Sequence, residues 1–175
     1  MDGMFSATKP VENPYEGNSC HSDSLKVGQE FQDFICDQTL KNLGIPLTIY
    51  QSKRYQYNIG ESRQGFEVKY DARSTGDCTH YENKPTYKVG IEVAEKTKAT
   101  NYSWAPSGIY RSDNTWMYVV GNYHQAWYFS KNILIKLHKS NRYKTCQTLP
   151  TIQTMLLPIE AADEYACIKL NFANL

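Results

Sequence analysis

The hydrophobic pattern of this chain predicts one long helix near its start. Between residues 25 and 43 apolar side chains recur at helical spacing, with Phe31 and Ile35 one turn apart on the same face. Gly44 follows directly and is a typical helix stop. Residues 1–24 are rich in Ser, Asn, Pro and Gly without periodicity, so we expect an irregular arm there.

The middle of the chain is dense in β-branched and aromatic residues, which favours strands. A mostly apolar run at 114–123 is typical of a strand buried on both faces, and Pro158 suggests that the last strand lies at an edge. Two further helices are expected, at 126–141 and 161–172. The predicted strands cover 45–62, 65–73, 86–96, 114–123 and 153–161. This order predicts an α/β fold with a mixed central β-sheet flanked by helices.

Length and composition limit the range of functions. A chain of 175 residues with 41% hydrophobic residues suits one domain, which we expect over residues 25–175. The net charge of +1 provides no general positive field for nucleic acid, so any such contact is expected to be local. The most concentrated basic stretch is 131–144, and Tyr102 and Trp104 are aromatic residues in a polar loop.

Cysteine usage and hydropathy indicate the cellular compartment in which we expect the protein. The five cysteines are an odd number without a closely spaced pair, which indicates a reducing compartment. No apolar run reaches the roughly 20 residues that a membrane span needs, and the N-terminus lacks a signal-peptide pattern. We therefore expect a soluble, cytoplasmic protein without a membrane partner.

Two of the predicted strands carry the candidate chemistry. Alternation places Glu67, Lys69 and Asp71 on one face of the first, and Glu92 and Lys96 share a face of the next. If the two strands form an antiparallel hairpin, Asp71 lies near Glu92. Facing carboxylates repel each other unless a cation lies between them, and Mg²⁺ binds one or two carboxylates while keeping waters for a substrate phosphate.

A neighbouring lysine would stabilise charge on a phosphoryl group or orient the attacking water. A glutamate of the first helix, Glu30, is a further candidate metal ligand. The same alternation of acids and lysine is also typical of the solvated face of a half-exposed sheet. The pattern alone leaves both interpretations open.

The order of a helix with an acid, a strand with an acid and a strand reading "IEV" with a nearby lysine resembles the PD-(D/E)xK, or restriction-endonuclease-like, nuclease superfamily. The segments "GFEVKYD", "KVGIEVAEK" and "SGIYRSDNTWMYVVG" are also similar to small phage-type members. The resemblance implies a Mg²⁺- or Mn²⁺-dependent nuclease acting on DNA. It implies Asp71 and Glu92 as the metal-binding acids, assisted by Glu67 and Glu30.

The chain departs from the family motif at Ala94, where a lysine is expected. Lys96 on the same strand or Lys69 on its neighbour would have to supply the ammonium group. A second register is also open, in which Glu67 and Lys69 form the E-x-K motif and Glu61 is the preceding acid.

The missing lysine supports an alternative function. A catalytically inactive relative would serve as a structural or DNA-binding component of a phage or a similar assembly. A phage-encoded protein would reside in the host cytoplasm. The sequence leaves open whether the protein forms a homodimer.

Overall fold

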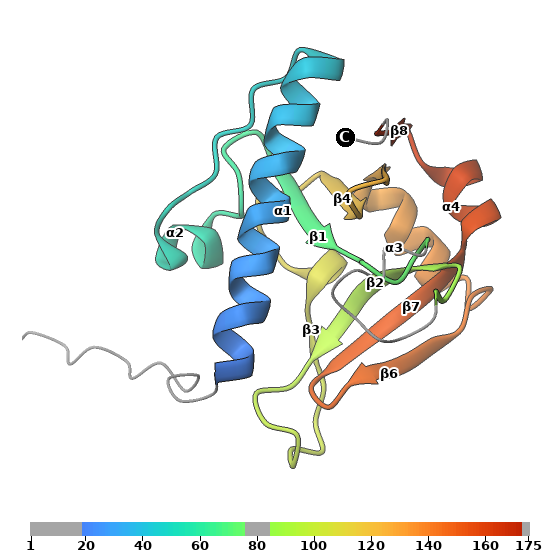
Figure 1. Cartoon of the computed structure of the whole chain (residues 1–175). Coiled ribbons are helices and arrows are strands. Elements are labelled where there is room, and N and C mark those ends of the chain that lie inside the picture. The colour runs from blue at the N-terminus through green and yellow to red at the C-terminus, as the bar shows by residue number, and fades with distance from the viewer. Residues whose placement is uncertain (1–18, 76–84, 173–175) are drawn as a thin grey trace, which may run out of the picture.

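A computed structural model of the chain describes residues 19–75 and 85–172. Within them the fold is α/β, with four α-helices and two β-sheets of four strands each (Figure 1). The helices are α1 (Ser19–Leu43), α2 (Lys53–Asn58), α3 (Lys131–Lys139) and α4 (Ile159–Tyr165), and a 3₁₀ turn, η1, covers Gly108–Tyr110. In the described part of the chain, no helix is both long and apolar enough to cross a membrane.

Sheet one has the strand order β1-β4-β5-β8. Its first two strands run parallel and the other neighbours run antiparallel. Its strands are β1 (Phe66–Tyr70), β4 (Met117–Gly121), β5 (Gln125–Ser130) and β8 (Ile168–Asn171). Sheet two is antiparallel throughout, in the order β3-β2-β7-β6. Its strands are β2 (Lys88–Glu95), β3 (Ala105–Pro106), β6 (Thr145–Leu149) and β7 (Ile152–Pro158).

Helix α1 covers one face of sheet one. Phe31 and Ile35 are fully buried, as the helical apolar stripe predicts, and pack against Val68 and Val119. Gly44 ends the helix with a positive φ of 69°, a conformation that glycine adopts without a Cβ penalty. The helix therefore occupies this face of β1, and the alternate residues of β1 point to the opposite side.

The second core lies on that opposite side of sheet one. Alternate residues of β2, β4 and β5 meet there, together with the buried faces of α3 and α4. Its fully buried members include Val89, Ile91, Tyr118, Trp127 and Leu134. The two cores together fix β1 and β4 between α1 and sheet two.

Four of the five expected strands are confirmed by β1, β2, β4 and β7, and all five residues of β4 are buried. The strand expected at 45–62 is wrong, because this segment contains α2 and only an isolated bridge between Ile49 and Ser62. The tyrosines that favoured a strand lie on the surface of α2, where no neighbouring strand pairs with them.

The segment 126–141 begins with strand β5 rather than with helix. Trp127 and Phe129 point into one core and Tyr128 points into the other, so this strand is buried on both faces. A buried strand of this kind has no alternation that would distinguish it from a helix. The helix α3 begins only at Lys131, and its Leu134 and Leu137 are buried as expected.

The C-terminal expectations also need correction. The helix expected over 161–172 is α4 followed by β8, and the sequence analysis missed β6. Strand β7 lies between β2 and β6 rather than at an edge, and Pro158 is tolerated because it is the final residue of the strand. At the other end, α1 extends six residues before Leu25; residues 1–18 lie outside the described ranges.

The expected hairpin between the two acid-bearing strands does not form. Strand β1 pairs with β4, whereas β2 pairs with β3 and β7 in the other sheet. Any meeting of their acids must therefore occur between sheets rather than across a hairpin.

Candidate functional site

A cavity of about 500 Å³ lies between the two sheets. Lys69, Asp71 and Glu92, all predicted site residues, line it together. Val120, Leu149, Ile152 and Leu156 contribute apolar walls, and Tyr118 and Thr154 add hydroxyl groups. This volume falls in the range of small-molecule sites, and a few polar groups among apolar walls are typical of them.

Strand β1 places Glu67 and Lys69 on the side away from α1. Glu67 lies opposite Tyr118 in the parallel ladder and is 1% exposed. Its Oε1 lies 2.8 Å from Lys69 Nζ, while Oε2 accepts no hydrogen bond from the described residues. A buried carboxylate needs a charged or hydrogen-bonding partner, so Glu67 is the counterion that holds the Lys69 ammonium.

Lys69 is one of three basic residues that line the cavity, with Arg73 and Lys88. Burial alone would lower its pKa, but Glu67, Tyr118, Glu61 and Glu92 together raise the pKa of Lys69 well above its ordinary value. The lysine is therefore protonated at neutral pH and presents a fixed cation. It offers charge stabilisation rather than a free amine.

Asp71 follows directly after β1 and docks on the other sheet. Its Oδ2 accepts a hydrogen bond of 2.9 Å from the backbone N–H of Gly90 in β2. Burial raises the pKa of Asp71, and hydrogen bonds from Gly90, Arg73 and Ser74 oppose that rise. A Cβ at position 90 would lie 3.4 Å from Oδ2 and 3.1 Å from the side chain of Thr154. Glycine therefore keeps this approach open.

Glu92 stands two residues beyond Gly90 on the same face of β2. Its Oε1 accepts a hydrogen bond from the hydroxyl of buried Ser107. The pairing of β2 with β7 shifts register between Glu92 and Ala94. Such bulges often re-aim a side chain beside a functional site; here the ladder resumes in a shifted register at Ala94.

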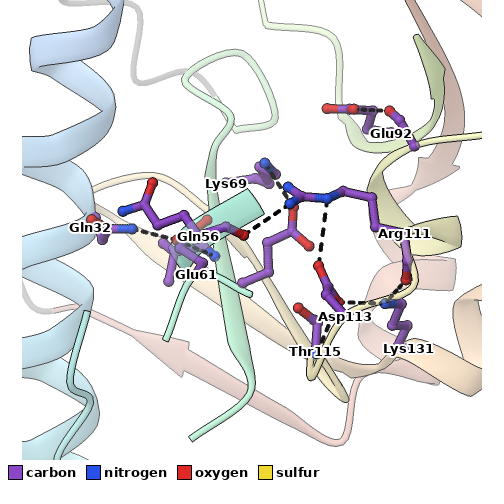
Figure 2. Close-up of polar contacts among 12 residues, drawn as sticks. Gln32, Gln56, Glu61, Lys69, Glu92, Arg111, Asp113, Thr115 and Lys131 are labelled. Atoms are coloured by element: carbon purple, nitrogen blue, oxygen red, sulfur yellow. Dashed lines mark hydrogen bonds and ion pairs between the residues drawn. The ribbon is translucent and has the colours of Figure 1, made fainter. Parts of the chain in front are cut away.

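Glu61 lies at the free edge of β1. Its Oε1 accepts hydrogen bonds from the backbone N–H of Val68, at 3.0 Å, and from the side-chain amide of Gln32 (Figure 2). Burial raises the pKa of Glu61, Lys69 lowers it and Glu67 raises it again. Glu61, the preceding acid of the second register, thus lies within electrostatic range of Glu67 and Lys69. It accepts a hydrogen bond at the edge of β1 and does not line the cavity.

Two predicted residues lie elsewhere. Glu30 is on α1, its side chain is 58% exposed and it pairs with Lys26 at 3.8 Å. Lys96 donates from Nζ to the carbonyl of Asn101 at 3.0 Å and lies over the Trp104 ring. Neither residue lines the cavity, so of the two lysines predicted to supply the ammonium group Lys69 is the one that the fold places with Asp71 and Glu92, and Lys88 lines the cavity as well.

A second charged network supports the region beside the cavity (Figure 2). Lys131 Nζ donates to Asp113 Oδ1 at 3.0 Å and to the carbonyl of Arg111 at 2.7 Å. Burial alone would raise the pKa of Asp113, but hydrogen bonds from Lys131 and Thr115 lower it below the ordinary value. Only 2% of the Asp113 side chain is exposed, so this lysine is a structural counterion and is not available to a polyanion.

The donor groups limit how a metal would bind. Among the described residues, no three His, Cys, Asp or Glu side chains gather in an arrangement that could hold a metal ion. Asp71 and Glu92 nevertheless line one cavity, where Asp71 accepts hydrogen bonds from Gly90, Arg73 and Ser74, and Glu92 accepts one from Ser107. A hard cation such as Mg²⁺ needs only one or two carboxylates besides water and substrate oxygens, so Asp71 and Glu92 are the residues that would hold it here.

Gly90, Ser107 and Tyr118 also contribute to the site, although none of the three was predicted as a site residue. A glycine inside a strand marks a close approach of another group, so Gly90 carried a readable signal for the docking of Asp71. Tyr118 was read only as part of a buried strand, although its hydroxyl is buried without a hydrogen-bond partner among the described residues. Ser107 had no local signal, because its contact with Glu92 depends on the path of the loop before η1.

No protein-family model, no curated protein sequence and no solved structure matches this chain.

Proposed function

We propose that this protein is a Mg²⁺-dependent nuclease that hydrolyses DNA phosphodiester bonds, with a fold of the restriction-endonuclease-like type. The observation that carries the proposal is the convergence of Lys69, Asp71 and Glu92 on one cavity, although they come from two different sheets. The alternative interpretation, the solvated face of a half-exposed sheet, would leave these three side chains exposed and separated from one another.

Each residue has a role that its surroundings support. Asp71 and Glu92 would hold Mg²⁺ or Mn²⁺, and the bound cation would supply Lewis-acid activation of the phosphate and of a water nucleophile. Lys69 stabilises negative charge on the non-bridging phosphate oxygens, because its ammonium remains protonated. Glu67 positions that ammonium through the 2.8 Å ion pair and is too buried to reach substrate.

Hydrogen bonds at the base of the site keep the acids in place. The Gly90 N–H fixes one oxygen of Asp71 and the Ser107 hydroxyl fixes one oxygen of Glu92. Ligands held by such outer contacts are more precisely oriented than free side chains. We therefore expect both acids to tolerate even isosteric amide substitution poorly.

A specific observation favours a second candidate function. Ala94 replaces the motif lysine, and Lys96 lies against Trp104 and away from the cavity. If Lys69 does not substitute for that lysine, the protein is a catalytically inactive relative that binds DNA or builds a phage or similar assembly.

Cleavage assays separate the two functions. Purified protein is incubated with linear, nicked and branched DNA in Mg²⁺, in Mn²⁺ and in EDTA, beside the variant Asp71→Asn. The nuclease proposal expects metal-dependent cleavage that Asp71→Asn lowers at least a hundredfold. Absence of cleavage on every substrate supports the inactive relative, and equal cleavage by the variant indicates a contaminating enzyme.

A further inference from the structure

Helix α2 has no buried residue. It contains six residues, and a helix of this length has almost no stability of its own in water. A surface helix normally persists because one face packs on the core. The reason for the order of α2 must therefore lie in specific contacts.

Those contacts hold the backbone of α2 and leave its side chains outside. Arg111 Nη2 donates to the carbonyl of Gln56 at 3.0 Å and to that of Tyr57 at 3.3 Å. Gln56 Nε2 in turn donates to the carbonyl of Tyr50 at 2.6 Å. The guanidinium also lies 3.6 Å from the Asp113 carboxylate, which ties the end of α2 to the buried charge network.

Two aromatic rings are displayed on this fixed helix. Tyr55 is 56% exposed and Tyr57 is 77% exposed. Tyr55 stacks on Tyr50 with ring centroids 5.9 Å apart, and Arg111 lies 5.8 Å from the Tyr57 ring centroid. The rings are thus supported from one side and present their remaining surface to solvent.

The charges around α2 are sorted by sign. Lys53, Arg54 and Arg63 are exposed. Two nearby acids are held inward: Glu61 accepts hydrogen bonds from Gln32 and Val68, and Asp113 is 2% exposed on its side chain, whereas Asp33 and Asp37 of α1 are exposed. In a chain with a net charge of only +1, this creates a local positive surface that complements a polyanion.

This surface lies close to β1, the strand that carries Lys69. Only Ile59 and Gly60 separate α2 from Glu61, whose charge acts on Lys69. Figure 2 shows Gln56 of α2 next to Glu61, beside the strand β1 that carries Lys69. A strand crossing α2 would therefore be led towards the phosphate-binding groups.

We propose that α2 is a binding platform for single-stranded nucleic acid, on which Tyr55 and Tyr57 stack unpaired bases while Lys53 and Arg54 contact phosphates. The direction of the strand into the cavity rests on the proposed nuclease function; the binding itself does not. Exposed aromatic rings beside cations bind single strands because every unpaired base offers a π-face. Duplex DNA keeps its bases stacked internally and offers them no such contact.

Binding is measured in EDTA, so that cleavage cannot contribute. The probe is a fluorescently labelled DNA single strand of about 16 nucleotides, followed by anisotropy. Stacking contributes roughly 1–3 kcal/mol per base, so we expect Tyr55→Ala with Tyr57→Ala to weaken binding at least tenfold. The matched control is Tyr102→Ala, whose ring is 98% exposed but lies outside α2, and it should bind as the wild type does.

The cations are tested by salt dependence. Lys53→Ala with Arg54→Ala should weaken binding and reduce the slope of log affinity against log salt by about 1–1.5, since each phosphate contact in a single strand contributes about 0.7. Lys136→Ala with Lys139→Ala removes two exposed cations from α3 and should leave the slope nearly unchanged. Far-UV circular dichroism checks that each variant is folded.

Three results overturn the proposal: no binding of single strands by the wild type, equal binding by the α2 tyrosine variant, or stronger binding of duplex. A dimer in size-exclusion chromatography that only the α2 variants dissociate would assign the surface to a second copy of the chain instead. Binding that depends on α2 without any DNA cleavage refutes the nuclease function and retains this inference. DNA cleavage together with unaltered binding by the α2 variants refutes this inference and retains the nuclease function.

Discussion

The buried ion pair of β1 gives the sharpest test of how the site is held. Replacing Lys69 with Met removes the cation 2.8 Å from Glu67 and leaves a carboxylate whose side chain is only 2% exposed. Breaking a buried pair in this way typically costs about 3–5 kcal/mol. Because the Lys69 side chain is itself 35% exposed, we expect the lower end, about 3 kcal/mol of unfolding free energy.

Urea unfolding followed by fluorescence measures this loss. With a urea dependence of about 2 kcal/mol per molar, the midpoint should fall by roughly 1.5 M. Adding Glu67→Gln to Lys69→Met should recover most of the loss, since neither member then leaves a buried charge. The control Lys169→Met breaks the pair with Asp163, which is 43% exposed, and should cost less than about 1 kcal/mol. A loss for Lys69→Met no larger than this control would refute the buried counterion.

Three further predictions concern the surrounding scaffold. Lys131→Met should lower the unfolding free energy by about 3–5 kcal/mol in urea titrations, because it leaves the Asp113 carboxylate buried without its cation. The pKa of Asp113 is lower in the folded protein than its ordinary value of 3.8. Wild-type stability should therefore fall as the pH drops below 3.8. In thermal melts over that pH range the Lys131→Met variant should lose less stability than the wild type. Gly108→Ala should be strongly destabilising in the same melts, because φ is 54° and a Cβ would lie 2.2 Å from the carbonyl oxygen of Glu92; a midpoint within about 2 °C of wild type would contradict this.

Local patterns predicted those elements whose partners impose a clear periodicity. Helix α1 could be predicted because its apolar stripe packs on a sheet, and β2 because its buried Val89, Ile91 and Val93 alternate with small or charged residues. Strand β5 could not be predicted in this way, because it is buried on both faces and shows no alternation of apolar and polar residues. The tyrosines of α2 led to the wrong prediction of a strand. A surface helix held by Arg111 needs no apolar stripe, so its sequence carries no helical periodicity.

Three of the six residues predicted for the candidate site lie together, but the way in which the fold brings them together was not predicted. Lys69, Asp71 and Glu92 do line one cavity, yet the hairpin invoked to join them does not form. Their meeting depends on the docking of Asp71 on Gly90 between sheets, a contact that spacing within a strand cannot encode. The choice between Lys69 and Lys96 likewise required the position of β1 relative to β2.

The rate of DNA cleavage in Mg²⁺ under single-turnover conditions tests the central claim most directly, with Glu92→Gln compared against Glu30→Gln. Both variants replace a carboxylate with its amide, but only Glu92 lines the cavity, whereas Glu30 is exposed on α1. We predict a loss of at least a hundredfold for Glu92→Gln and an unchanged rate for Glu30→Gln. Equal rates in the two variants, or no cleavage by the wild type, would contradict the assignment of this cavity as a nuclease site.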